Sequence, residues 1–500
     1  MHIAFLNPQG NFDAQDSYWT EHADFGGQLV YVKQVALAMA ALGHTVDIVT
    51  RKIEDPAWLE FAETYDRYPE SERVRIVRLP AGPPEFLRKE LLWPHLVRDW
   101  VRHIAGFYFR SKGGILPDAF TTHYGDGGLC GALLEAEMHL PFTFTGHSLG
   151  AQKLDKLHPT PKTLPDIDAQ YFFSRRIAAE RLSMNRSAVN ITSTRMERME
   201  QYGHRAYHGA VDVHDERRFA VIPPGVNLLT FDKEARYVGE VATQNHLRAM
   251  LERDIAEERR ELPAIIASSR LDPKKNHLAL VQAFAQSPAL QAAANLVIFT
   301  GALSDPLHDD SKASPGEREV LAEIRQVIET HALWSKVSAF AVPGQPALAA
   351  AYRFFAQRPG SLFALTALYE PFGLAPLEAA AAGLPLVVTR NGGPSESLFE
   401  NGVEYGVLVN PADPADIARG LERLVLDKGA WAEFAQRGRQ RVHDRYTWER
   451  TAEGYLAAIE QIVADPGVRR PAELLPIPAY FQQPDEADTE LFTALQTFIA

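Results

Sequence analysis

The sequence predicts an α/β protein with two doubly wound, mainly parallel sheets. Short β-rich apolar runs alternate with segments of helical periodicity almost from end to end, and this alternation is typical of βαβ units. The alternation restarts after the turn Ile222-Pro223-Pro224-Gly225, whose prolines and glycine break any helix or strand. We therefore expect two Rossmann-like domains, at 1–225 and 226–450, with the helices of 451–500 crossing back to the first domain.

The first domain is expected to begin with a βα unit. The apolar residues of Leu29–Leu42 have helical spacing, and Gly43 is a typical C-terminal glycine. Runs of apolar and β-branched residues predict the strands around this helix and after it. They are Ile3–Leu6, Val46–Thr50, Val74–Leu79, Phe120–His123, Phe142–Gly146, Ala188–Ser193 and Phe219–Ile222.

The second domain repeats the pattern. Strands are expected at Ala264–Ser269, Asn295–Thr300, Val337–Ala341, Leu362–Thr366, Leu386–Thr389 and Gly406–Val409. Helical periodicity lies between and after them, at Asn276–Ala285, Gly316–Thr330, Pro376–Ala382, Trp448–Val463 and Glu490–Phe498. Ligands of open α/β sheets bind beyond the carboxyl ends of the strands. A cleft between two such domains would suit a nucleotide-containing ligand, so motifs just after strands are the candidates for function.

Composition excludes several classes of protein. Of 500 residues, 46% are apolar and 23% are charged, which is typical of a soluble globular protein. The 64 acidic residues exceed the 51 basic ones, and a net charge of -13 disfavours nucleic-acid binding. No apolar stretch is long enough for a membrane span and no signal peptide is evident, so a cytoplasmic location is expected. Cys130, the single cysteine, is expected to lie in the core rather than act as a nucleophile.

Two strings in the second half carry the strongest chemical signal. Arg270 follows a strand and Lys275 precedes a helix, so both could neutralise a diphosphate, although a solvated basic turn has the same composition. Glu370 and Glu378 flank the apolar turn Pro371–Leu377. A carboxylate in such a turn needs a partner, and sugar hydroxyls are good candidates. The alternative is that one of these carboxylates lies at a helix N-terminus and the other forms a structural ion pair.

The first half contributes weaker signals. Gly26 and Gly27 lie before a helix, where backbone N–H groups can approach a phosphate, although a double glycine is also common in simple turns. His147 ends a strand, and such a histidine is usually structural. A metal site from His123, Asp126 and His147 is conceivable, but this spacing is not diagnostic, and we expect no metal.

Taken together, these strings resemble those of retaining glycosyltransferases of the GT-B fold. The sequence is similar to the bacterial members of the sucrose-phosphate synthase family. The stretches that carry the resemblance lie in both halves: Phe5–Gly10, Ser17–Trp19, Asp24–Lys33, Thr145–Gly150, Pro223–Val226, Glu370–Glu378 and Thr389–Pro394. The string from Glu370 to Glu378 indicates only the superfamily, whereas Gly26-Gly27-Gln28 and Gly146–Gly150 indicate the sucrose and sucrose-phosphate synthase branch.

The resemblance implies a reaction and a set of donor contacts. Glucose would pass from a nucleotide diphosphoglucose, UDP-glucose above all, to fructose 6-phosphate with retention at the anomeric carbon. Arg270 and Lys275 would hold the diphosphate together with the Gly26-Gly27 loop, and Glu378 would bind the ribose. Glu370 and the backbone of Phe372, Gly373 and Leu374 would hold the donor sugar, with His147 against it.

The resemblance also implies the acceptor site and leaves alternatives open. The acceptor contacts would be Gln28, Lys89, Tyr124, Ser148, Lys153, and Arg175 or Arg176. No carboxylate that clearly suits double displacement is evident, which favours front-face attack. No Asp-x-Asp motif is evident either, so no cofactor is expected to be required and Mg²⁺ at most to stimulate. A separate sucrose-phosphate phosphatase is expected downstream. Sucrose synthase chemistry, mannosyl transfer to fructose 6-phosphate and a non-catalytic nucleotide-sugar binding protein remain the alternatives.

Overall fold

The computed structural model divides the chain into two compact units. Unit 1 comprises Met1–Pro223 and Thr451–Ala500, and unit 2 comprises Pro224–Arg450. The boundary predicted from the sequence lies at 225, with a return segment at 451–500. The structure describes residues 1–19, 22, 24–110, 115–465, 467, 471, 473–484 and 488–499. Within these ranges, no helix is long and apolar enough to cross a membrane.

Unit 1 contains an eight-stranded sheet in the order β3-β4-β2-β1-β5-β6-β7-β8. Its strands are β1 His2–Leu6, β2 Thr45–Arg51, β3 Tyr65–Arg67, β4 Val74–Leu79, β5 Ala119–His123, β6 Phe142–Thr145, β7 Val189–Thr192 and β8 Phe219–Val221. All neighbours are parallel except β3, which pairs antiparallel with β4. The sequence analysis missed β3. The strand is short and polar, and the brief connection to β4 suits a hairpin rather than a helical crossover.

Unit 2 contains a parallel six-stranded sheet in the order β11-β10-β9-β12-β13-β16. Its strands are β9 Ala264–Ser268, β10 Asn295–Thr300, β11 Val337–Ala341, β12 Leu362–Leu365, β13 Leu386–Thr389 and β16 Val407–Val409. Every residue of β10 is buried, as expected for a parallel strand with both faces covered. A small antiparallel pair, β14 Phe399–Glu400 and β15 Val403–Glu404, was also missed by the sequence analysis.

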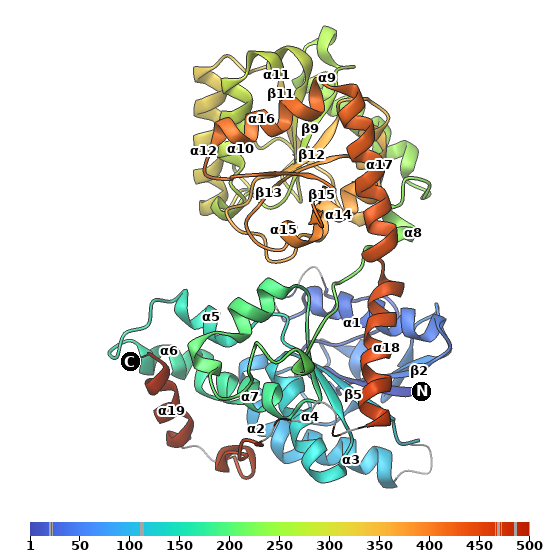
Figure 1. Cartoon of the computed structure of the whole chain (residues 1–500), viewed down its shortest axis with the longest axis vertical. Helices are drawn as coiled ribbons and strands as arrows, with labels where there is room; N and C mark the ends of the chain where they lie inside the picture. Colours follow the sequence, from blue (N-terminus) through green and yellow to red (C-terminus); the bar gives the residue numbers. More distant parts are fainter. Residues whose placement is uncertain are drawn as a thin grey trace. The chain divides into compact units, whose positions relative to one another are not determined.

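Helices cover the sheets within each unit (Figure 1). Those of unit 1 used below are α1 Gly27–Ala41, α4 Tyr124–Met138, α5 Gly150–Asp155, α6 Leu164–Tyr171, α7 Phe173–Arg186 and α19 Thr489–Ile499. Those of unit 2 are α10 His277–Gln286, α12 Pro315–Thr330, α14 Leu374–Ala381 and α17 Lys428–Arg445. The parallel βαβ architecture predicted from the sequence is confirmed, and most element ends agree within two residues.

Helix α18, Trp448–Ala464, begins in unit 2 and continues into unit 1. There the hydroxyl of Tyr455 lies 3.1 Å from that of Tyr31 on α1 and 2.7 Å from Oγ1 of Thr145 on β6. These three buried hydroxyls satisfy one another, so the helix is fixed against the sheet by polar as well as apolar contacts. Figure 1 shows α18 against the N-terminal part of the chain, beside α1 and β2.

Candidate functional site

A pocket of about 190 Å³ lies within unit 1. It is formed by the loop before α1, the segment around residue 90 and the N-terminal parts of α4, α5 and α7. The lining residues are Gln9, Gly26, Gly27, Gln28, Lys89, Glu90, Trp93, Tyr124, Gly125, Asp126, Lys153, Tyr171 and Arg176. The structure therefore brings together the predicted Gly26-Gly27 loop and most of the predicted acceptor contacts.

Three cations line this pocket, and two of them are held by carboxylates. Nζ of Lys89 donates to Asp24 at 2.7 Å, and Nε of Arg176 donates to Glu180 at 2.9 Å. The Nζ of Lys153 forms no hydrogen bond or ion pair with the described part of the chain. Desolvation, together with the positive charges of Arg176 and Lys89, lowers the pKa of Lys153 to about 8. Lys153 is therefore the pocket cation whose charge no carboxylate of the described residues compensates.

Two further polar side chains of the pocket, Gln28 and Asp126, are buried with few hydrogen-bond partners. Gln28 is only 5% exposed, and its Nε2 has no hydrogen-bond partner. A buried amide without a partner is costly, so a ligand oxygen would satisfy it. Asp126 accepts from the backbone N–H of Gly127 at 2.7 Å, and burial raises the pKa of its carboxyl to about 6. Both side chains are placed to meet hydroxyl groups of a small polar ligand.

Two predicted acceptor residues do not lie in the pocket lining. Nε of Arg175 donates to Asp488 at 2.6 Å, and its guanidinium stacks over the rings of Phe172 and Tyr480. Ser148 contributes its carbonyl oxygen, which accepts from Nη2 of Arg176 at 2.5 Å. Of the two adjacent arginines, Arg176 therefore faces the pocket, while Arg175 fastens the C-terminal segment to α7.

His147 forms a pair with His123. Nε2 of His147 lies 2.8 Å from Nδ1 of His123 and the two rings stack, while Tyr31 packs edge-on against His147. Burial lowers the pKa of His147 to about 4, so the ring is neutral near pH 7. The histidines bond to each other, and the described residues group only Asp254, Asp305 and His308 within metal-binding distance. The His123, Asp126 and His147 metal set is therefore not assembled.

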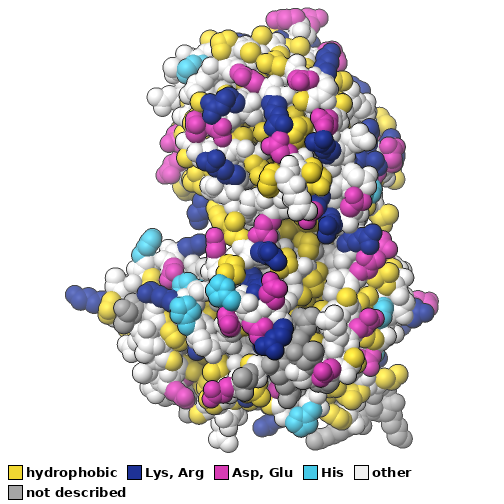
Figure 2. Space-filling model, viewed as in Figure 1, with side chains coloured by type: hydrophobic (Ala, Val, Ile, Leu, Met, Phe, Trp, Pro, Cys, Tyr) yellow, Lys and Arg dark blue, Asp and Glu magenta, His cyan; other side chains and the backbone are white. Residues whose placement is uncertain are grey.

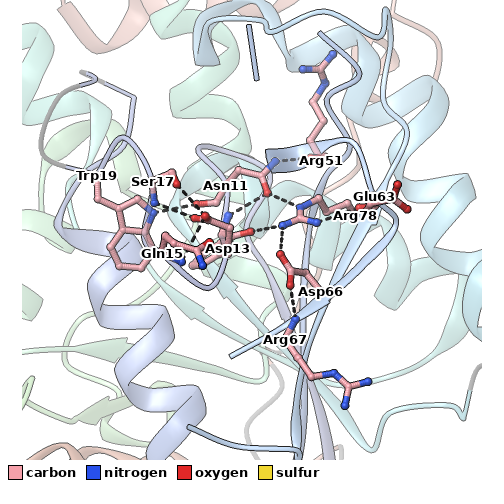
Figure 3. A network of polar contacts seen from close by, with 11 residues as sticks. Asn11, Asp13, Gln15, Ser17, Trp19, Arg51, Glu63, Asp66, Arg67 and Arg78 are labelled. Atoms are coloured by element: carbon pink, nitrogen blue, oxygen red, sulfur yellow. Dashed lines mark hydrogen bonds and ion pairs between the residues drawn. The ribbon is translucent and has the colours of Figure 1, made fainter. Parts of the chain in front are cut away.

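A buried arginine anchors the loop that leads to the pocket (Figure 3). Arg78 on β4 is fully buried and donates to Oδ1 of Asn11, to the carbonyl of Phe12 and to Asp66. Asn11 in turn donates to the carbonyl of Arg51 at 2.7 Å. Because the described residues between β1 and α1 form neither helix nor strand, these hydrogen bonds fix the path that brings Gln9 and the two glycines to the pocket.

The predicted cations of unit 2 lie in the loop between β9 and α10. Arg270 is exposed, and its guanidinium has no hydrogen-bond or ion-pair partner among the residues described, whereas Nζ of Lys275 donates to Oε2 of Glu370 at 2.7 Å. Behind them, Nε2 of the buried His277 lies 2.9 Å from Oγ of Ser269, and burial lowers the pKa of His277 to about 4. A neutral histidine here shapes the loop without adding a further positive charge to those of Arg270, Lys274 and Lys275.

The loop after β12 packs closely on a second glycine turn. The N–H of Glu370 donates to Asn391 and the N–H of Gly393 donates to Glu370. A Cβ at Gly392 would lie 2.1 Å from the carbonyl oxygen of Glu370, and its φ of +99° also favours glycine. The string Thr389–Pro394 therefore supports the loop that carries Glu370.

Helix α14 positions the second carboxylate of unit 2. The helix begins at Leu374, two residues earlier than predicted, because a proline is tolerated in a first helical turn and Pro376 does not open the helix. Gly373, with a φ of +94°, makes the turn into it. The carboxylate of Glu378 has no hydrogen-bond or ion-pair partner in the described ranges, and burial raises the pKa of its carboxyl to about 7.

Comparisons with known proteins agree with this arrangement. Residues 26–225 match the Glycosyl transferase 4-like domain, and residues 251–441 match Glycosyl transferases group 1. A protein of Thermosipho melanesiensis named probable sucrose-phosphate synthase is 42% identical over 463 residues, which cover 92% of this chain and 97% of that protein. The chain belongs to the sucrose-phosphate synthase family. It is a glycosyltransferase.

Plant members of the sucrose-phosphate synthase family are longer. The Zea mays protein named sucrose-phosphate synthase is 33% identical over 511 residues, and the chain spans about half of it (47%). Among solved structures, sucrose-phosphate synthase from Thermosynechococcus elongatus has a TM-score of 0.62 at 24% identity, covering 93% of this chain and 99% of that one. The GT-B fold predicted from the sequence is confirmed.

Four residues that support the sites of this member of the sucrose-phosphate synthase family were not anticipated from the sequence. They are Asp24, Arg78 and Glu180, which contact a site residue or its loop, and Tyr207, which donates to Glu180. A signal existed for Arg78, because an arginine within the apolar strand Val74–Leu79 must find buried acceptors. Glu180 lies on α7, Tyr207 ends a short 3-10 helix and Asp24 lies in a turn, and no local pattern marks any of the three.

Proposed function

We propose that the protein is a sucrose-phosphate synthase that transfers glucose, with retention, from a nucleotide diphosphoglucose to fructose 6-phosphate. The observation that carries the proposal is the meeting of Lys89, Lys153 and Arg176 in one pocket of an acidic chain. A sugar phosphate has close to two negative charges near neutral pH and needs charge-assisted donors. Gln28 and Asp126, on the same lining, would meet the sugar hydroxyls.

Unit 2 would hold the donor. Arg270 and Lys275 would neutralise the diphosphate, and Glu378 would accept hydrogen bonds from the ribose. Glu370 and the backbone of Phe372, Gly373 and Leu374, where the chain enters α14, would bind the transferred sugar. Anabaena HepE, a protein of similar fold, was solved in complex with UDP-glucose, and its TM-score is 0.53 at 16% identity. UDP-glucose is therefore the donor that we propose first.

The chemistry would be a front-face displacement. As the bond from the anomeric carbon to the diphosphate breaks, negative charge grows on the leaving oxygen, and Arg270 and Lys275 would stabilise it. That same phosphate oxygen would take the proton of the attacking fructose hydroxyl. Neutral His147 would contact a donor hydroxyl through the ring nitrogen that His123 does not use. Since two side-chain cations carry out the neutralisation, we propose that no metal is required.

A matrix of donors and acceptors tests this function. UDP-glucose, ADP-glucose and GDP-mannose would each be offered with fructose 6-phosphate and with fructose, and products identified by mass and by anomeric configuration. We expect sucrose phosphate from a glucose donor and fructose 6-phosphate, with equal yield when a chelator is added. The product retains its phosphate, so a separate phosphatase would act next. Free sucrose as the main product, or a mannosyl product, would contradict the proposal, as would nucleotide-sugar binding without turnover.

A further inference from the structure

Glu180 on α7 is a fully buried carboxylate beside the pocket of unit 1, although it does not line it. Three donors reach it. They are Nε of Arg176 at 2.9 Å, the backbone N–H of Gly150 at 2.9 Å and the hydroxyl of Tyr207. Tyr207 also accepts from the N–H of Ala151 at 3.0 Å. One carboxylate therefore joins α7, the start of α5 and Tyr207 in a single buried network.

This network fixes the direction of a pocket cation. Nε of Arg176 is held by Glu180 and Nη2 by the carbonyl of Ser148, so the planar guanidinium has little freedom to rotate. Nη1 has no hydrogen-bond partner in the described chain and is available to a ligand. Gly150 supports the arrangement, because a Cβ there would lie 3.0 Å from Cδ of Arg176.

The same network occupies the start of the helix that carries Lys153. The N–H groups of Gly150 and Ala151 are used by Glu180 and Tyr207, so they are not available to an anion. A phosphate in this pocket must therefore be bound by side chains. The position of Lys153, on the first turn of α5 after these residues, depends on the same anchor.

From this geometry the structure assigns Glu180 as a positioning residue that orients Arg176 and α5 and thereby sets the preference for a phosphorylated over an unphosphorylated acceptor. The assignment rests on the proposed function, since it requires that the pocket receive a sugar phosphate. Glu180 acts through Arg176 and α5 and touches no substrate itself.

The test compares two glutamates that each face an arginine of α7. Glu180→Gln keeps the shape of the side chain but removes its charge. Glu135→Gln is the matched control, because Glu135 is also buried and lies 3.5 Å from Arg186 at the opposite end of α7. We expect Glu180→Gln to lower the ratio of kcat/KM for fructose 6-phosphate to that for fructose by about tenfold, with an unchanged KM for the donor. Glu135→Gln should leave this ratio unchanged.

A double-mutant cycle with Arg176→Ala tests whether Glu180→Gln acts by misplacing Arg176 or by destabilising the protein in general. If Glu180 acts through Arg176, Glu180→Gln should lower the ratio no further, or by less, in the Arg176→Ala background. Should Glu180→Gln fail to fold, Tyr207→Phe removes one donor from the same carboxylate and is expected to lower the ratio by about threefold. An equal loss with both acceptors, or tighter binding of fructose 6-phosphate, would overturn the assignment.

The failure of this assignment is distinguishable from failure of the proposed function. A wild-type protein that does not prefer fructose 6-phosphate to fructose contradicts the proposed function and the role of Glu180 with it. A wild-type preference that Lys153→Ala abolishes and Glu180→Gln leaves intact contradicts only the role of Glu180.

Discussion

In the pocket of unit 1, carboxylates hold two of the three cations, whereas in the predicted donor site of unit 2 a carboxylate holds one of two. Asp24 and Glu180 engage Lys89 and Arg176, and Glu370 engages Lys275. Each region thus retains one cation that no carboxylate of the described residues pairs with, Lys153 in unit 1 and Arg270 in unit 2.

The difference between paired and unpaired cations shows where substitutions are informative. Removing a paired cation also leaves its carboxylate beside a bound phosphate, so two effects combine. Removing an unpaired cation deletes only its contact with the ligand. Lys153 and Arg270 are therefore the positions at which the two regions are best compared.

The largest effect is expected for Arg270→Ala. The diphosphate gains charge as the glycosidic bond breaks, so this contact strengthens in the transition state. We expect kcat to fall by about 10²–10³-fold, with a smaller rise in the donor KM, in steady-state kinetics with UDP-glucose varied. The neighbouring Lys274 is exposed, so Lys274→Ala should have wild-type kinetics. If kcat is unchanged and only donor binding is weaker, Arg270 contacts the bound donor but does not stabilise the transition state, which would contradict this prediction.

Lys153→Ala should affect the acceptor and not the donor. Loss of one charge-assisted contact to the phosphate should raise the KM for fructose 6-phosphate by about 10- to 150-fold. Use of fructose, which has no phosphate, should change little. Lys156, exposed at the end of α5, provides the control variant Lys156→Ala. Equal losses with both acceptors would mean that Lys153 does not bind the phosphate.

The binding of UDP should depend on the ionisation of Glu378. Its pKa is raised to about 7 by burial, and only the ionised carboxylate accepts from both ribose hydroxyls. As pH falls below 7 the carboxylate is protonated, and the dissociation constant of UDP should rise by up to about tenfold per pH unit. Residue 378 cannot titrate in Glu378→Gln, and the titration of UDP itself affects both proteins equally. The dissociation constant of UDP for the wild type, divided by that for Glu378→Gln, should therefore rise as pH falls below 7 and level off at low pH. A ratio independent of pH from 5 to 8 would exclude Glu378 from the ribose site.

The smallest effect compares the glycine loops of the two regions. Gly392→Ala forces a Cβ against the carbonyl of Glu370 at a positive φ. A strain of about 1–3 kcal/mol should lower the Tm of unit 2 by about 2–10 °C. A Cβ at Gly27 would meet nothing within 4 Å, so Gly27→Ala should leave the Tm unchanged in calorimetry. An equal decrease in Tm for Gly392→Ala and Gly27→Ala would contradict the difference in packing between the two loops.

The parallel sheets are confirmed, and the unit 2 motifs could be found in the sequence because both are local patterns. Arg270–Lys275 and Glu370–Glu378 are each contiguous strings after a buried strand. The polar support of the unit 1 pocket is different, since Asp24 meets Lys89 and Glu180 meets Gly150 across long stretches of chain. The choice between Arg175 and Arg176 also required the structure. Adjacent helical residues point about 100° apart, and only the packing of α7 decides which one faces the pocket.

The most direct test of two separate ligand regions is a crossed binding experiment by calorimetry. UDP would be titrated into wild-type protein, Glu378→Gln and Lys153→Ala, and fructose 6-phosphate would be titrated into the same three proteins with UDP kept saturating. We expect Glu378→Gln to weaken UDP by about 10- to 150-fold and Lys153→Ala to weaken fructose 6-phosphate by a similar factor, each leaving the other ligand unchanged. Loss of fructose 6-phosphate binding in Glu378→Gln, or of UDP binding in Lys153→Ala, would contradict the assignment of donor to unit 2 and acceptor phosphate to unit 1.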